Sequence, residues 1–130
     1  MTGERSYEEI TSSDLRKLAR FAQAHRERWF RYDKPTNVFE HRFLCSALCQ
    51  GAALHFLDGK SGIKDFDILE FYAEVSNVRI PHRTRWCYDF GPSKFGRQKD
   101  PIIHPEFEGR RIDLYVRALP VEPDADPVEV

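Results

Sequence analysis

The sequence lacks any long apolar run. None approaches the roughly 20 residues that a transmembrane helix needs, and the mean hydropathy is −0.59. No charged-then-apolar leader opens the chain. There are only three cysteines, an odd number at irregular spacing, which argues against a secreted disulfide scaffold. We therefore expect a cytoplasmic protein with no membrane partner.

The chain also lacks a charge bias. Its 20 Lys and Arg oppose 21 Asp and Glu, which leaves −1 overall and excludes a protein that coats nucleic acid or anionic lipid by bulk charge. What it does have is a composition that is 41% hydrophobic and 13% aromatic over 130 residues, enough to build one core. We expect a single domain over residues 1–119, followed by a mobile, acidic and proline-rich tail at 120–130.

Helical spacing of apolar residues predicts two N-terminal helices. The first begins at the capping residues 11–14 and ends near Tyr32, ahead of Pro35. The second begins at Thr36 or Asn37 and runs through Leu48. Gly51 interrupts it, and residues 52–57 form a short helical or irregular piece.

Alternating patterns predict strands at 63–71, 85–90 and 110–117, and we expect the second of them to pair antiparallel with residues 77–80. Glycines and prolines make residues 91–105 a long loop. The predicted fold class is α+β (α/β-like), a small mixed β-sheet with the N-terminal helices packed on it.

Three aspartates in these strands are the strongest chemical signal. Asp65 and Asp67 are two residues apart, so strand geometry places both carboxylates on one side of the sheet. Asp113 lies between apolar residues in a later strand that can deliver a third carboxylate. We expect them on one exposed cleft face, as a site for Mg²⁺ or Mn²⁺. A solvated sheet face without a metal is the alternative.

The run Ala47-Leu48-Cys49-Gln50-Gly51-Ala52-Ala53-Leu54-His55, then Asp65-Phe66-Asp67-Ile68 and later Ile112-Asp113-Leu114, resembles the nucleotidyltransferase superfamily that includes DNA polymerase beta. The resemblance covers about residues 44–116. The run Gly51-Ala52-Ala53-Leu54-His55 is especially similar to small bacterial nucleotidyltransferase-like proteins with a Gly-Gly-x-Ala-Leu turn, some of which belong to toxin–antitoxin systems.

The resemblance implies a minimal nucleotidyltransferase fold and a metal-dependent transferase. Its catalytic and metal-binding residues are Asp65, Asp67 and Asp113. The substrate is a nucleoside triphosphate, whose nucleoside monophosphate passes to an unidentified acceptor. Its phosphates are expected to meet the Gly51-Ala52 turn and basic residues nearby or on the 91–97 loop, namely Lys60, Lys64, Lys94 and Arg97.

Three other interpretations stay open. The turn holds a single glycine and no serine, which favours a catalytically inactive interaction or antitoxin-like module with a protein partner subunit. Eight basic against four acidic residues between 76 and 111 favour a nucleic-acid binder. Finally, Cys45 and Cys49, four apart on the predicted helix, can bind zinc together with Cys87 and a histidine, although buried free cysteines are the commoner use.

Overall fold

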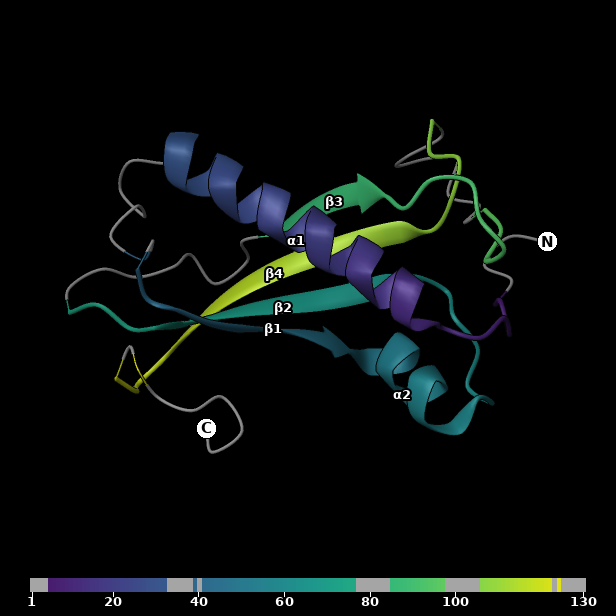
Figure 1. Ribbon diagram of the computed structural model, residues 1–130, viewed down its shortest axis with the longest axis horizontal. Helices are drawn as coiled ribbons and strands as arrows, with labels where there is room; N and C mark the ends of the chain where they lie inside the picture. Colours follow the sequence, from purple (N-terminus) through teal and green to yellow (C-terminus); the bar gives the residue numbers. More distant parts are fainter. Residues whose placement is uncertain are drawn as a thin grey trace.

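Two helices pack on one face of a four-stranded mixed sheet (Figure 1). The structure is a computed structural model that describes residues 5–32, 39, 41–76, 85–97, 106–122 and 124. In chain order the elements are α1 (Ser12–Tyr32), β1 (Phe43–Cys49), α2 (Gln50–Asp58), β2 (Phe66–Ala73), β3 (Arg85–Asp89) and β4 (Arg111–Leu119). The predicted α+β class is confirmed.

The sheet has the strand order β1-β2-β4-β3. Its two central strands, β2 and β4, are parallel, whereas β1 and β3 pair antiparallel to them at the two edges. The parallel register sets Asp67 beside Asp113, and the antiparallel register sets Cys49 beside Asp67. Residues far apart in sequence thus meet at one end of the sheet.

Strand alternation separates the two faces of the sheet. On one face Ile68, Ile112 and Leu114 are buried against α1 and α2, in a core cluster that includes Leu18 and Ala52. A second cluster gathers Trp29, Phe39, Tyr72 and Val116 around the end of α1. Because successive strand residues point to opposite faces, Asp67 and Asp113 lie on the face away from the helices.

The first helix agrees with the prediction from sequence. Thr11 Oγ1 accepts the backbone N–H of Asp14 at 3.3 Å, and Asp14 Oδ2 accepts the N–H of Thr11 at 2.8 Å. These reciprocal bonds satisfy N–H groups that a helix start leaves without intrahelical partners, which accounts for the beginning of α1 at Ser12.

The prediction of a helix through Leu48 is wrong, because Phe43–Cys49 is the edge strand β1. The run Phe-Leu-Cys-Ser-Ala-Leu-Cys is apolar apart from one serine, so it suits either period, and its pairing with β2 decides in favour of a strand. The expected start of that helix lies mostly outside the described residues. Gly51 does not interrupt a helix; it is the second residue of α2.

The three predicted strands are confirmed with shifted ends. They run over Phe66–Ala73, Arg85–Asp89 and Arg111–Leu119. The partner strand expected at 77–80, much of the expected 91–105 loop and most of the expected tail lie outside the described residues.

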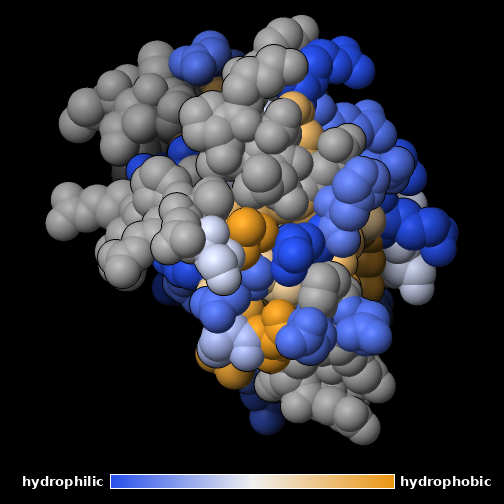
Figure 2. Space-filling model, turned by 90° about the vertical axis from the view of Figure 1, so that its left-hand side faces the viewer, coloured by the Kyte–Doolittle hydropathy of each residue, from blue (hydrophilic) through white to orange (hydrophobic). Residues whose placement is uncertain are grey.

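The surface is mixed in polarity. At the end of the molecule where α1 ends, hydrophobic side chains form only small patches between hydrophilic ones (Figure 2). Among the described residues, no helix combines the length and hydrophobicity that a bilayer crossing requires.

Candidate functional site: three aspartates and an arginine

The structure brings Asp65, Asp67 and Asp113 together. Each offers one carboxylate oxygen, and these oxygens lie within 4.8 Å of one another. Asp65 directly precedes β2, Asp67 is the second residue of that strand, and Asp113 is the partner of Asp67 on β4. Two neighbouring parallel strands therefore build a cluster of hard oxygen ligands of the kind that Mg²⁺ and Mn²⁺ prefer.

The burial of this cluster differs from the expectation of an exposed cleft. Asp67 is 7% exposed and Asp113 is 2% exposed, while the Asp65 side chain is 19% exposed. A solvated sheet face, the alternative to a site, does not describe these residues either. Buried carboxylates in contact need compensating positive charge, because desolvation and mutual repulsion both disfavour the charged form.

The crowding of the three carboxylates affects the pKa of Asp67. Burial raises the pKa of Asp67 to about 7, and the charges of Asp65 and Asp113 push in the same direction. The positive charge of Arg111 opposes them only in part. Arg111 thus compensates only part of the cost of ionising all three carboxylates, which is a condition that fits a divalent cation.

Arg111 lies among the three carboxylates. Its Nη2 is 3.1 Å from Asp65 Oδ2, and its Nε is 3.2 Å from Asp113. The side chain is 17% exposed. The sequence placed Arg111 only in a general basic excess, yet its position two residues before Asp113 on the same strand was a usable signal, since residues i and i+2 share a face.

Cys87 is the second residue at the site that the sequence did not assign to it. It faces Asp113 across the β3–β4 pair, and its thiol donates a hydrogen bond to Asp113 Oδ1 at 3.0 Å. Burial and this carboxylate raise the pKa of Cys87 to about 11. The group is therefore a neutral thiol that holds Asp113 in place. Cys45 and Cys49, expected on a helix, lie on β1, and the aspartates are the one metal-capable group found in the described residues.

The first turn of α2 lies next to the cluster in the chain and in the sheet. Cys49 is paired with Asp67, and α2 begins at the following residue. Its first N–H groups receive no side-chain cap from Cys49. Gln50 has a φ of 57°, an uncommon value for a residue other than glycine and one that is found often at functional sites.

Gly51 is not required by the packing of the fold. Its φ is not in the left-handed region, and a β-carbon there would meet only ordinary contacts, 3.6 Å from Arg5 Nη1 and 3.9 Å from the Gly62 carbonyl oxygen. By contrast, a β-carbon on Gly109 would come within 1.9 Å of the Gly91 carbonyl oxygen. The packing around position 51 would therefore accept a β-carbon, which Gly51 does not supply.

The other residues expected to bind phosphate are dispersed. The backbone N–H of Lys60 donates to Asp58 Oδ1 at 2.8 Å, in the exposed turn after α2. Lys64 is exposed and directly precedes Asp65. Lys94 Nζ is 3.0 Å from Asp14 Oδ2, which holds it on the α1 side of the sheet, and Arg97 Nε donates to the Phe107 carbonyl at 2.6 Å. Ala52 is 1% exposed within the core, so only its backbone can serve a ligand.

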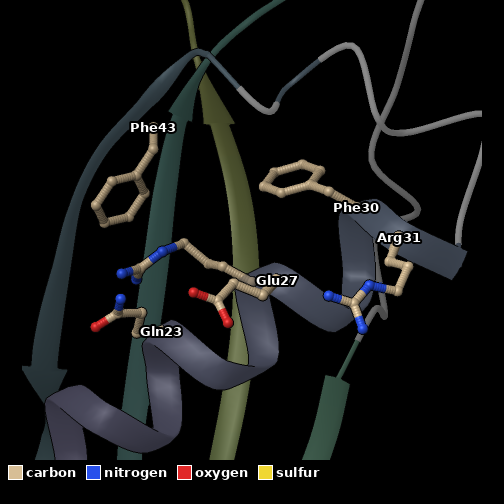
Figure 3. A pocket seen from close by; sticks show the side chains of 6 residues that line it. Gln23, Glu27, Phe30, Arg31 and Phe43 are labelled. Atoms are coloured by element: carbon tan, nitrogen blue, oxygen red, sulfur yellow. The ribbon is translucent and has the colours of Figure 1, made fainter.

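Two hollows in the surface lie apart from the aspartates. One, of about 580 Å³, lies between α1 and β1, and the Phe30 and Phe43 rings flank it (Figure 3). It is lined by Gln23, Arg26, Glu27, Phe30, Arg31 and Phe43. The other, of about 840 Å³, is lined by Arg5, Ser6, Tyr7, Glu8, Lys94, Phe95 and Arg110. Neither contains Asp65, Asp67 or Asp113.

Comparison with known proteins adds no assignment. The chain matches no protein-family model, no curated protein and no solved structure.

Proposed function

We propose that the protein is a metal-dependent nucleotidyltransferase that uses a nucleoside triphosphate. The observation that carries this proposal is the convergence of three carboxylates, two of them buried, beside the uncapped start of α2. Carboxylates hold divalent ions that bridge phosphate oxygens, and backbone N–H groups at a helix start attract the phosphates themselves. Three free cysteines and a balanced charge make the cytoplasm the proposed compartment.

In the proposed reaction an acceptor hydroxyl attacks the α-phosphorus in line with the bond to the β-phosphate. The new P–O bond joins the nucleoside monophosphate to the acceptor, the α–β bond breaks, and pyrophosphate leaves with its electron pair. The hydroxyl proton passes to Asp113. A bound Mg²⁺ would neutralise the charge that develops on the phosphate oxygens. Asp65, Asp67 and Asp113 would hold that ion, and Gly51 would let the backbone approach the phosphates.

Two measurements on matched variants test the proposal. Mn²⁺ should broaden the amide NMR signals around the three aspartates selectively, in the wild type and in Asp58→Asn but not in Asp67→Asn. Asp58 is the exposed last residue of α2, so its variant controls for the loss of one carboxylate elsewhere. Transfer of α-³²P label from each of the four nucleoside triphosphates to material of a host lysate should likewise occur with the wild type and Asp58→Asn but not with Asp67→Asn. No selective broadening and no transfer would contradict the proposal.

The alternative is an inactive module with the same fold and a protein partner. Its support is Arg111, which already partly neutralises the carboxylates, together with the single glycine of the turn. In that case the cluster is a permanent ion-pair network. Mn²⁺ would then leave the amide signals unchanged, and a stable heterocomplex without label transfer would be recovered from the host.

A further inference from the structure

The position of Arg111 has a consequence for how a metal enters the site. Its guanidinium contacts Asp65 at 3.1 Å and Asp113 at 3.2 Å, on two different strands. Those are two of the three groups whose oxygens lie within 4.8 Å of one another. A cation bound between the carboxylates therefore competes with the arginine for two of the same three groups.

The charges make coexistence of the two cations unfavourable. A guanidinium within hydrogen-bonding distance of the carboxylates is only a few ångströms from any ion bound to them, and repulsion at that distance is strong in a buried site. The arginine also cannot lose its charge, because its pKa lies far above neutrality. Entry of a divalent ion thus requires the guanidinium to move.

The Arg111 side chain has room to move away from the carboxylates. The Arg111 side chain is long and is 17% exposed, and none of the described helices covers this face of the sheet. Once released it remains beside the bound metal, where the phosphates of a nucleotide would lie. Arginine binds phosphate oxygens in a bidentate manner, so a triphosphate offers the displaced group a new partner.

We propose that Arg111 is an exchangeable internal cation: it fills the aspartate cluster in the metal-free protein, and a divalent ion displaces it to the phosphates of the nucleotide. This inference rests on the proposed function. It predicts that metal and nucleotide bind cooperatively, because the nucleotide stabilises the position that the arginine takes after the metal displaces it.

The test is Mn²⁺ affinity, followed by electron paramagnetic resonance, for the wild type, Arg111→Gln, Arg111→Lys and Arg85→Gln. Arg85 is exposed and is paired with Tyr115, two residues beyond Asp113 on β4, so its variant removes a positive charge near the cluster without touching the ion pairs. We expect Arg111→Gln to bind Mn²⁺ at least about tenfold more tightly than the wild type. Arg85→Gln should stay within about threefold of the wild type. If Arg111→Gln fails to fold, Arg111→Lys is the deciding variant. A lysine cannot contact two carboxylates with the planar, two-pronged geometry of a guanidinium, so this variant should bind Mn²⁺ more tightly than the wild type.

Cooperativity is measured by repeating the titration with a triphosphate analogue that has a methylene bridge between its α- and β-phosphorus atoms. The analogue should tighten Mn²⁺ binding more in the wild type than in Arg111→Gln. Equal affinity of the wild type and Arg111→Gln for Mn²⁺ would overturn the inference and leave the proposed function intact. An affinity for Mn²⁺ that rises as much in Arg85→Gln as in Arg111→Gln would do the same. If neither the wild type nor any variant binds Mn²⁺, both this inference and the proposed function are contradicted.

Discussion

At the scale of single residues, two buried ionisable groups respond to pH in opposite directions. Burial holds the pKa of His25 down at about 4, and burial with repulsion holds that of Asp67 up at about 7. The contribution of His25 to the free energy of unfolding grows as the pH rises, and that of Asp67 grows as the pH falls. Their effects overlap between about pH 4 and 7, so the stability of the wild type alone will not separate them.

His25 should make the protein sensitive to acid. Its Nδ1 lies 2.6 Å from the Tyr88 hydroxyl, and its ring is packed 4.3 Å from that of Trp86. Because the unfolded chain binds this proton more readily, the stability that a neutral His25 contributes is complete above pH 6.5. It is lost as the pH falls through 6.5 towards 4, by up to about 3 kcal/mol. Urea titrations should show this slope in the wild type and a flatter one in His25→Phe.

Asp67 should cost stability at alkaline pH in the absence of metal. Its pKa is raised above the unfolded value, so the fold is favoured below pH 4 and loses stability as the pH rises through about 7. Asp67→Asn should therefore be more stable than the wild type at pH 8 in a chelating buffer, by up to about 4 kcal/mol. Urea titrations at pH 4 should show a much smaller difference. A variant less stable than the wild type at both values would contradict this account.

At the scale of elements, Gly51 at the start of α2 separates folding from function. Nothing in the packing of the helix requires a glycine there, and alanine has the higher helix propensity by about 1 kcal/mol. Gly51→Ala should keep or raise the melting temperature while it weakens binding of the triphosphate analogue. Scanning calorimetry and titration calorimetry check the two outcomes. A variant that binds the analogue as well as the wild type would remove Gly51 from the phosphate site.

One buried ion pair joins α1 to the sheet. Arg26 on α1 donates to the fully buried Glu70 of β2 at 2.8 Å, and the Ser46 hydroxyl of β1 donates to the same carboxylate. Arg26 also lies over the Phe43 ring, 4.0 Å from its centre, and lines the hollow between α1 and β1. Three elements thus meet at Glu70. Burial raises the pKa of Glu70, although Ser46 and Arg26 both act to lower it.

Removal of Arg26 alone should be more damaging than removal of the pair. Arg26→Leu leaves the Glu70 charge buried with only a hydroxyl, so we expect a loss of about 3 to 5 kcal/mol at pH 7. The double variant Arg26→Leu, Glu70→Leu leaves no buried charge and should recover much of that loss. Chemical denaturation of the three proteins gives the comparison. Equal losses in the single and double variants would contradict the buried-charge explanation.

At the scale of the whole molecule, the aspartate cluster couples metal binding to folding. Asp67 lies on β2, Asp65 directly precedes it, and Asp113 lies on β4, so the three carboxylates come together only when these two strands are paired. A ligand that binds the native state alone stabilises it by about 2.7 kcal/mol at one hundred times its dissociation constant. Mg²⁺ should therefore raise the melting temperature of the wild type and of Asp58→Asn, and a chelator should reverse the shift. Asp113→Asn should show no such rise.

Some features could be predicted from the sequence because they depend on neighbours along the chain. The capping residues and apolar spacing of α1 are local, as are the period of two that aligns Asp65 with Asp67 and the apolar flanks of Asp113. The α+β class followed from these same patterns. Each of these signals needs only the fixed geometry of a helix or a strand.

Only the tertiary structure decided the rest. The apolar run at 43–49 suits a helix as well as a strand, and pairing with β2 made it a strand. The burial of Asp67 and Asp113 and the place of Arg111 depend on partners such as Asp65, which is 46 positions away in the chain. Contacts over that distance arise from sheet order and register, and no local period encodes them.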